Sequence, residues 1–284
     1  MKGFYWLASY PKSGNTWLRL VLNSYRLGGS EPDFSRKQNF APIASSRRRF
    51  DELLGIASSD LLPDELLTLR PRMYEAQLTE AREPLFNKVH DAWQLTSLGE
   101  PLFPATSTLG AVYIVRDPRD VVLSLAGHID ISVDRAIDLL LDEAAILCDQ
   151  KLGLRDQLPQ RLNSWSRHVL SWIDLPAPWS PLLIRYEDML ATPMASFACV
   201  IKYCGWALDD KRLEQALEAT RFDRLQAAEA SHGFSERPQR AARFFREGRA
   251  GGWREQLSQA QLRRIEDATE PVRARLAYHS AFES

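Results

Sequence analysis

The sequence predicts an α/β fold, with a single domain built on a central parallel β-sheet flanked by helices. Short apolar segments typical of buried strands alternate with longer segments whose apolar residues recur at helical spacing. Alternation of this kind favours parallel strands covered by helices on both faces. No internal repeat or low-complexity linker interrupts the 284 residues, so one domain over 1–284 is the expectation.

The strands are expected at 3–9, 84–90, 111–116 and 181–186. Helices are expected at 15–27, 193–203, 209–220 and 258–276. A further helix is expected to begin at Pro118, with Asp117 as its N-cap. Residues 28–83 carry a Gly-Gly pair and four prolines, which predicts short helices and loops.

Composition excludes several classes of protein. The 36 basic and 37 acidic residues nearly cancel, so a chain-wide nucleic-acid surface is not expected. The longest apolar runs, such as 111–115, are too short for a membrane span. Three cysteines without a CxxC pair fit a reducing compartment, the cytoplasm. The five histidines are far apart in sequence, so no metal site is expected.

One stretch departs from this neutral balance. Residues 221–254 hold eight arginines and four acidic residues, which favours a localised anion site. Arginines recur there at every third position from 237 to 249, including Arg240, and a solvated face is the alternative interpretation. Phosphate binding is favoured only for Arg246, with Arg249 as a second candidate.

The turn between the first strand and the first helix, Tyr-Pro-Lys-Ser-Gly-Asn-Thr-Trp, is suited to an anion. Gly14 allows close approach of the backbone, and free N–H groups at the helix start point at a ligand. Ser13, Asn15 and Thr16 add side-chain donors, and Lys12 adds a positive charge. The turn lacks the GxxxxGK[ST] pattern, so a Walker-type triphosphate site is disfavoured. An ordinary strand-to-helix turn is the alternative.

Two further segments carry candidate chemistry. Lys88 and His90 lie two residues apart at a strand end, so alternation places them on one face. A histidine beside a lysine is a candidate general base, although a lone histidine at a strand end is more often structural. Arg116 and Ser124 could grip a second phosphate; an ion pair and a buried hydroxyl are the alternatives.

Together these segments resemble the sulfotransferase family that uses 3'-phosphoadenosine-5'-phosphosulfate (PAPS), specifically its cytosolic type. Six segments match in the family's order over nearly the whole chain. They are YPKSGNTW from Tyr10, NKVH from Asn87, VRDPRDVVLS from Val115, RYEDM from Arg185, ATRF from Ala219 and FFREGRAGGW from Phe244.

The resemblance implies a sulfuryl transfer by in-line displacement from PAPS to a hydroxyl of a small-molecule acceptor. His90 is implied as the general base, with Lys12 and Lys88 as the other catalytic residues. Ser124 is implied to bind the 3'-phosphate and to restrain Lys12. The implied nucleotide-binding residues are Lys12, Ser13, Gly14, Asn15, Thr16, Trp17, Arg116, Ser124, Tyr186, Thr220, Phe222, Phe245, Arg246 and Gly248. The implied product is 3',5'-adenosine bisphosphate (PAP), with no metal, nucleic acid or membrane span.

The sequence also departs from the family. Glu247 stands where a second basic residue is usual, and Arg249 is the candidate to replace it. Gly252 replaces a usual acidic residue, and the family's dimerisation signature is not recognisable at 254–263. Asn15 replaces a common threonine. The same change is seen in sulfotransferases that modify bacterial glycopeptide antibiotics, so a bacterial-like, natural-product tailoring member is one candidate identity.

Two alternatives stay open: a small-molecule kinase of related architecture, and a non-catalytic module that binds anions through the arginine-rich stretch. Segments 28–83, 91–109 and 225–242 are expected to form the lid and the acceptor site. Phe34, Phe40, Phe50 and Trp93 suggest an apolar or aromatic acceptor, with packing as their more common role. Phenols, natural-product scaffolds and lipids are all compatible acceptors.

Overall fold

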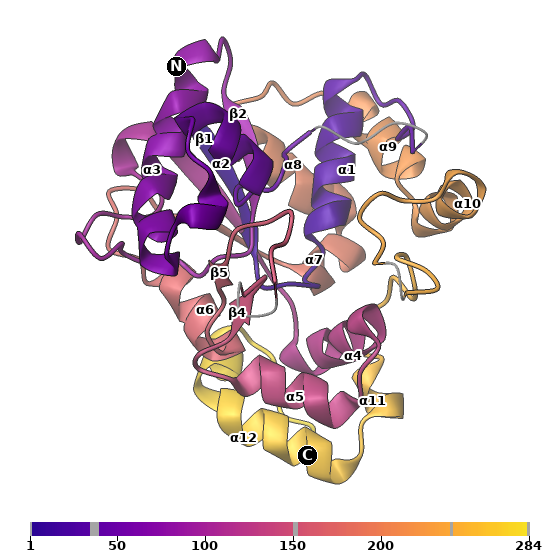
Figure 1. Ribbon diagram of the computed structural model, residues 1–284. Helices are drawn as coiled ribbons and strands as arrows, with labels where there is room; N and C mark the ends of the chain where they lie inside the picture. Colours follow the sequence, from indigo (N-terminus) through magenta and orange to yellow (C-terminus); the bar gives the residue numbers. More distant parts are fainter. Residues whose placement is uncertain (1, 35–39, 150–152, 239–240, 283–284) are drawn as a thin grey trace. The chain divides into compact units, whose positions relative to one another are not determined.

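The computed structural model describes residues 2–34, 40–149, 153–238 and 241–282 (Figure 1). The chain divides into two compact units. The first comprises Met1–Tyr10, Ala41–Tyr113 and Asp142–Leu183. The second comprises Pro11–Phe40, Ile114–Leu141 and Ile184–Ser284. One domain over 1–284 stays a prediction. Two parts of the expected lid segments lie outside the described residues, namely 35–39 and 239–240, the latter including Arg240.

A four-stranded sheet organises the first unit, in the order β2-β1-β3-β6. The strands are β1 (Phe4–Ser9), β2 (Leu85–Val89), β3 (Thr108–Val115) and β6 (Leu182–Arg185). β1 and β2 run parallel, with Ala8 opposite Val89. Five of the six β1 residues are buried, as expected for a strand covered on both faces. The predicted parallel sheet flanked by helices is confirmed.

Three helices accompany this sheet: α2 (Arg47–Leu54), α3 (Pro63–Glu80) and α6 (Trp165–Ile173). Short 3-10 turns occur at Ser58–Asp60 and Ala105–Ser107, and β4 (Ile146–Leu147) pairs antiparallel with β5 (Gln160–Arg161). α3 is longer than predicted, because Pro71 does not end it. Burial of Arg70, Met73 and Tyr74 on either side of Pro71 compensates for the hydrogen bond that proline cannot donate.

Aromatic rings form much of the core of this unit. The Trp6 ring lies 4.5 Å from Phe4, 5.0 Å from Tyr74 and 4.9 Å from Phe103, between ring centroids. Trp172 extends the cluster, 5.3 Å from Phe103. Large buried rings of this kind contribute both apolar area and favourable edge and stacking geometry.

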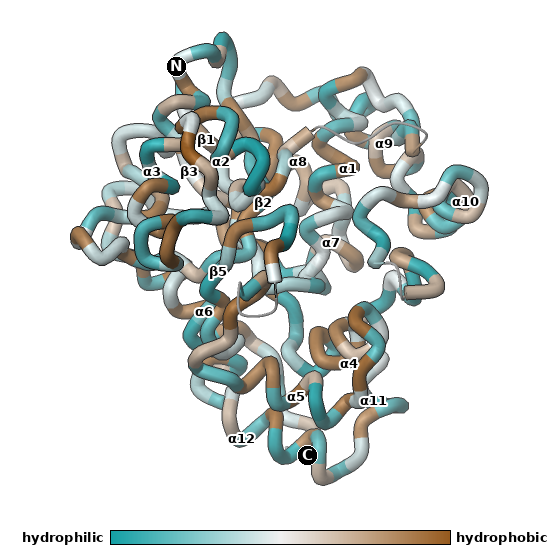
Figure 2. Tube along the Cα trace, in the orientation of Figure 1, coloured by the Kyte–Doolittle hydropathy of each residue, from teal (hydrophilic) through white to brown (hydrophobic). Residues whose placement is uncertain are grey.

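The second unit is mainly helical. Its elements are α1 (Asn15–Arg26), α4 (Pro118–Ile129), α5 (Val133–Leu141), α7 (Tyr186–Ala191), α8 (Pro193–Tyr203), α9 (Asp210–Ala219), α10 (Phe222–His232), α11 (Trp253–Gln256) and α12 (Gln259–Arg275). α4 begins as predicted, because the Asp117 carboxylate accepts a hydrogen bond from the Arg119 N–H. Hydrophobic residues dominate α4 (Figure 2). Within the described residues, no helix combines the length and apolar character that a bilayer crossing needs.

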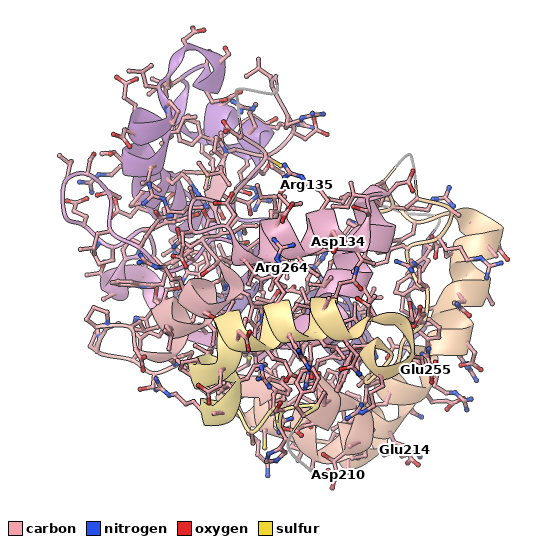
Figure 3. All side chains as sticks on the ribbon, turned by 90° about the horizontal axis from the view of Figure 1, so that it is seen from below. Asp134, Arg135, Asp210, Glu214, Glu255 and Arg264 are labelled. Carbon is pink, nitrogen blue, oxygen red and sulfur yellow. The ribbon has the colours of Figure 1, made fainter. Side chains whose placement is uncertain are left out.

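A polar seam joins α5 to α12 in the second unit. Arg264 donates to Asp138 at 2.5 Å, and Gln261 donates to Asp134 at 3.2 Å. Figure 3 shows Asp134 and Arg135 on α5 near Arg264 on α12. These exposed pairs contribute little free energy individually, so the apolar faces of the two helices supply most of the packing.

We expect the free energy of unfolding to fall in mild acid because of His168. Burial lowers the pKa of this fully buried imidazole to about 4. The unfolded chain, with an ordinary pKa near 6.5, then binds the extra proton first as pH falls. The stabilisation that comes from the lowered pKa of His168 is complete above pH 6.5. Roughly 2 kcal/mol of the free energy of unfolding is lost between pH 6.5 and 5. Urea unfolding of wild type and His168→Gln across this range measures it. Parallel pH profiles for the two proteins would contradict the assignment.

Candidate active site

The connection from β1 to α1 has the backbone of an anion cradle. Lys12 and Gly14 both take positive φ, 71° and 104°, in the left-handed region that non-glycine residues rarely adopt. No side chain caps the start of α1, and its first turn holds no acidic residue. A helix start without such a cap can present N–H groups to a ligand, at the end where the helix dipole favours negative charge.

Gly14 and Ser13 add two features that favour a bound group at this predicted cradle. A Cβ on Gly14 would lie 2.5 Å from the Tyr186 ring, so only glycine leaves the backbone accessible here. The Ser13 hydroxyl is completely buried and has no hydrogen-bond partner within the described structure. A buried hydroxyl without a partner costs free energy, which an anionic acceptor would recover.

The Lys12 ammonium group has a partner that the sequence did not predict. Its Nζ lies 3.1 Å from Nδ1 of His128, in the last turn of α4, and 4.6 Å from the centroid of the Phe244 ring. Because an ammonium group only donates, Nδ1 of His128 accepts and this imidazole is neutral. His128 lies four residues after Ser124, on the same helix face, and that spacing is the signal that could have identified it.

Arg116 ties the cradle to the glycine-rich segment, residues 244–253. Its Nη1 donates to the Lys12 carbonyl at 3.1 Å, and its Nη2 donates to the Arg249 carbonyl at 3.0 Å. Its guanidinium group lies 4.5 Å from the centroid of the Tyr186 ring. Burial raises the pKa of Tyr186, so its phenol stays neutral beside this cation. The structure thus brings four sequence-predicted segments together around one guanidinium group.

Asp120 holds the glycine-rich segment to α4. Its carboxylate accepts from the Gly251 N–H at 2.6 Å and from the Trp253 N–H at 3.1 Å. Burial raises the pKa of Asp120, and these two backbone donors oppose the shift. The carboxylate is one that sequence reasoning did not assign, although its place three residues after the N-cap of α4 marked it as a first-turn acid.

The basic residues of the glycine-rich segment differ in their surroundings. The Arg246 guanidinium lies against Gly127, and its Nη1 is 3.4 Å from the Leu123 carbonyl. Arg249 instead donates to Glu247 at 3.1 Å and to Glu255 at 2.9 Å. Glu255 and Glu247 raise the pKa of Arg249, and their negative charges compensate its positive charge. This geometry supports Arg246 as a phosphate ligand more than Arg249.

Several of the other predicted nucleotide-binding residues pack against neighbouring groups. Trp17 packs edge-on against Phe197, 5.2 Å between centroids, and Phe222 covers Gly248 so closely that a Cβ there would lie 2.2 Å from its ring. Thr220 is fully buried and its hydroxyl donates to the Ala216 carbonyl at 2.7 Å, within its own helix. Phe245 is buried in an apolar cluster. Thr220 and Phe245 thus also contribute to packing, besides their predicted place in the nucleotide site.

Glu236 is a further residue that sequence reasoning missed. Its carboxylate accepts from Arg19 at 2.7 Å and lies 3.5 Å from the Thr16 hydroxyl. A negative group therefore already contacts a donor of the predicted phosphate cradle. No sequence pattern indicated this contact, since the two segments are more than 200 residues apart.

Lys88 and His90 belong to the first unit, at the carboxyl end of β2. Lys88 pairs with Leu7 of β1, and its N–H and C=O bond to Pro42 and Ala44. His90 follows the last strand residue, and its Nδ1 lies 2.9 Å from the Ser9 carbonyl. Because a carbonyl only accepts, Nδ1 carries a proton, and in the neutral imidazole Nε2 is then the nitrogen without one. Nε2 is the nitrogen that can act as a base.

Two of the aromatic candidates for acceptor contact are packing residues. Phe50 is fully buried, and Phe34 packs with Phe234 and Phe245. Phe40 and Trp93 are partly exposed. Within the described residues, no group of three or more histidine, cysteine, aspartate or glutamate side chains could hold a metal ion.

The protein-family model named sulfotransferase domain matches residues 4–277 of this chain. The chain belongs to the sulfotransferase family. A flavonol 3-sulfotransferase of Flaveria bidentis is 25% identical over 278 residues, covering 92% of this chain and 78% of the relative. Sulfotransferase 1A1 of Rattus norvegicus is 22% identical over 273 residues, covering 92% and 81%. The resemblance stated from the motifs, and the enzyme class that it implied, are confirmed.

Solved sulfotransferase structures share the fold. Mouse sulfotransferase SULT7A1, complexed with PAP, aligns with a TM-score of 0.59 at 18% identity over 98% of this chain and 90% of its own. A retinol dehydratase in complex with androsterone and PAP aligns with a TM-score of 0.60, also at 18% identity, over 95% and 80%. The family's donor nucleotide is PAPS, of which PAP is the desulfated product.

We expect Gly14→Ala to abolish PAP binding while the chain still folds. The added methyl group meets the Tyr186 ring, and alanine disfavours a φ of 104°. Gly28→Ala is the matched control, because Gly28 also has positive φ but no atom within 4 Å of its Cβ position. Titration calorimetry with PAP should show binding for Gly28→Ala only. Equal affinities for both variants would remove Gly14 from the cradle.

Proposed function

We propose that this sulfotransferase moves a sulfuryl group from PAPS to a hydroxyl of a small-molecule acceptor, with His90 as the general base. The observation that carries the proposal is the 2.9 Å contact between Nδ1 of His90 and the Ser9 carbonyl. The Nδ1–H of His90 donates to this carbonyl, which presents Nε2 as a proton acceptor in a fixed orientation. PAPS supplies the sulfuryl group and a phosphate leaving group.

The cradle residues would hold the donor nucleotide. Ser13 offers a buried hydroxyl without a partner, and Gly14 keeps the backbone N–H groups accessible. Arg116 and Arg246 are the guanidinium groups proposed for the 3'-phosphate, together with the Ser124 hydroxyl. Trp17 and Phe222 are proposed to contact the adenine. We retain Asn15, Thr16, Tyr186, Thr220, Phe245 and Gly248 as proposed positions of the nucleotide site.

The proton and charge steps are assigned to three side chains. Nε2 of His90 takes the acceptor's hydroxyl proton as the new oxygen–sulfur bond forms and the bond from sulfur to the phosphate oxygen breaks. The leaving phosphate keeps the electron pair, and the Lys12 ammonium neutralises the charge that develops there. Lys88 positions the sulfuryl oxygens. His128, as the neutral hydrogen-bond acceptor of Lys12, leaves that lysine its full positive charge.

A hydroxylated apolar compound is the proposed acceptor class. A relative is named for a flavonol, and one structural neighbour holds androsterone, both hydroxylated ring systems. Phe40 and Trp93 remain candidates for acceptor contact. We propose the cytoplasm as the compartment, because relatives carry the name cytosolic sulfotransferase and the three cysteines form no disulfide in the described structure.

A binding comparison separates this function from its alternatives. We expect PAP to bind without magnesium, in preference to ATP with magnesium and to a polyanion such as heparin. Titration calorimetry with the three ligands measures the order. Preference for magnesium–ATP would favour a kinase, and steeply salt-dependent binding of the polyanion alone would favour an anion-binding module.

We expect His90→Ala to lower kcat by roughly 10²- to 10⁴-fold, because turnover then lacks its base. PAP affinity should stay within about twofold of wild type, since the proposed nucleotide contacts come from other residues. Transfer of labelled sulfate from PAPS to a panel of hydroxylated compounds is the assay. His279→Ala, which removes an exposed imidazole, is the control and should keep full activity. Full activity of His90→Ala would refute the assignment.

A further inference from the structure

A chain of buried hydrogen bonds runs from Tyr113 through His168 to the main chain of His90, the proposed base. Behind the carboxyl ends of β1 and β2, His168 of α6 is completely buried, and its Nε2 lies 3.0 Å from the His90 carbonyl oxygen. Its Nδ1 lies 2.9 Å from the hydroxyl of Tyr113, a buried residue of β3. None of these contacts is used by the proposed proton transfer.

The carbonyl fixes the direction of every hydrogen bond in this chain. The His90 carbonyl only accepts, so Nε2 of His168 donates and Nδ1 of His168 accepts from the Tyr113 hydroxyl. A backbone hydrogen bond from Tyr10 reaches the same phenol. His168 therefore occupies a single tautomer, and burial keeps it neutral by lowering its pKa to about 4.

His90 is thereby held from both sides of its Cα. Its side chain is fixed through Nδ1 to the Ser9 carbonyl, and its main chain is fixed through the carbonyl to His168. The next residue is equally constrained: the Asp91 carboxylate accepts two hydrogen bonds from Arg70, both at 2.7 Å, and its carbonyl accepts one from Trp172 at 3.0 Å. Rotation of the 90–91 peptide would break several buried hydrogen bonds at once.

We infer that His168 and Tyr113 are positioning residues for His90. They hold its main chain through the hydrogen bond to the His90 carbonyl, and this keeps Nδ1 within reach of the Ser9 carbonyl, the contact that sets the tautomer. This inference rests on the proposed function of His90. Misplacement of a reacting group by about 1 Å can cost roughly 10²-fold in rate. Loss of these hydrogen bonds should therefore lower kcat with little effect on the binding of the donor nucleotide.

Three variants test the chain. Tyr113→Phe removes only the hydroxyl that donates to His168, and we expect kcat to fall about tenfold. His168→Leu removes the donor to the His90 carbonyl at similar volume, and we expect a fall of about 10²-fold. His168→Gln places an amide N–H near the position of Nε2, and it should restore kcat to within about threefold of wild type. The KM for PAPS and the Kd for PAP should stay unchanged.

Thr108→Val is the matched control. Thr108 also lies in β3, and its hydroxyl takes part in two hydrogen bonds, accepting from Trp6 and donating to the Pro104 carbonyl. This variant removes a hydroxyl from the same strand, but that hydroxyl takes no part in the hydrogen bonds among Tyr113, His168 and His90. We therefore expect kcat to stay unchanged. Thermal unfolding of every variant identifies any that fails to fold, and Tyr113→Phe, as the smallest change, keeps the test valid if His168→Leu fails.

A spectroscopic readout separates this inference from the proposed function. Nitrogen-15 NMR of the imidazoles should show His90 with its proton on Nδ1 in wild type, and a mixture of tautomers in Tyr113→Phe and His168→Leu. That result supports the inference even if no acceptor is sulfated, which would overturn the proposed function alone. An unchanged tautomer and unchanged kcat in both variants would overturn the inference and leave the role of His90 intact.

Discussion

The parallel pairing of β1 with β2 is the constraint on which the rest of this chemistry depends. Because Ala8 lies opposite Val89, both strands end at the same level. The residue after β2, His90, can then donate to the last residue of β1. A register shift of one residue would reverse the faces of β2 and remove this hydrogen bond. The tautomer of the proposed base is thus a consequence of strand pairing.

In the second unit, contacts within the protein hold the cations around the proposed anion cradle. Each cation near the cradle makes hydrogen bonds or ion pairs within the protein: Lys12 with His128, Arg116 with two carbonyls, and Arg249 with two carboxylates. These contacts reduce repulsion among the cations and limit their side-chain freedom. A nucleotide bound as proposed would meet groups that are already partly ordered, which would lower the entropy cost of binding.

Most strands and helices could be predicted because their signals are local. The Asp117–Pro118 start of α4 and the glycine of the cradle need only neighbouring residues to be recognised. α3 could not be predicted at its full length, since the burial that carries it past Pro71 comes from distant segments. His128 and Glu236 were missed for the same reason: each acts on the cradle from another part of the chain. The motif resemblance supplied roles that spacing alone could not.

The Glu236 carboxylate gives the cradle a resident negative charge. With Arg19 as its partner and the Thr16 hydroxyl beside it, this side chain already satisfies part of the positive potential at the start of α1. Any anion that contacts Thr16 must first compensate for the displaced glutamate. Chloride or a simple carboxylate offers no more charge than the group it replaces. At the proposed nucleotide site, this glutamate would favour multiply charged anions over chloride and simple carboxylates.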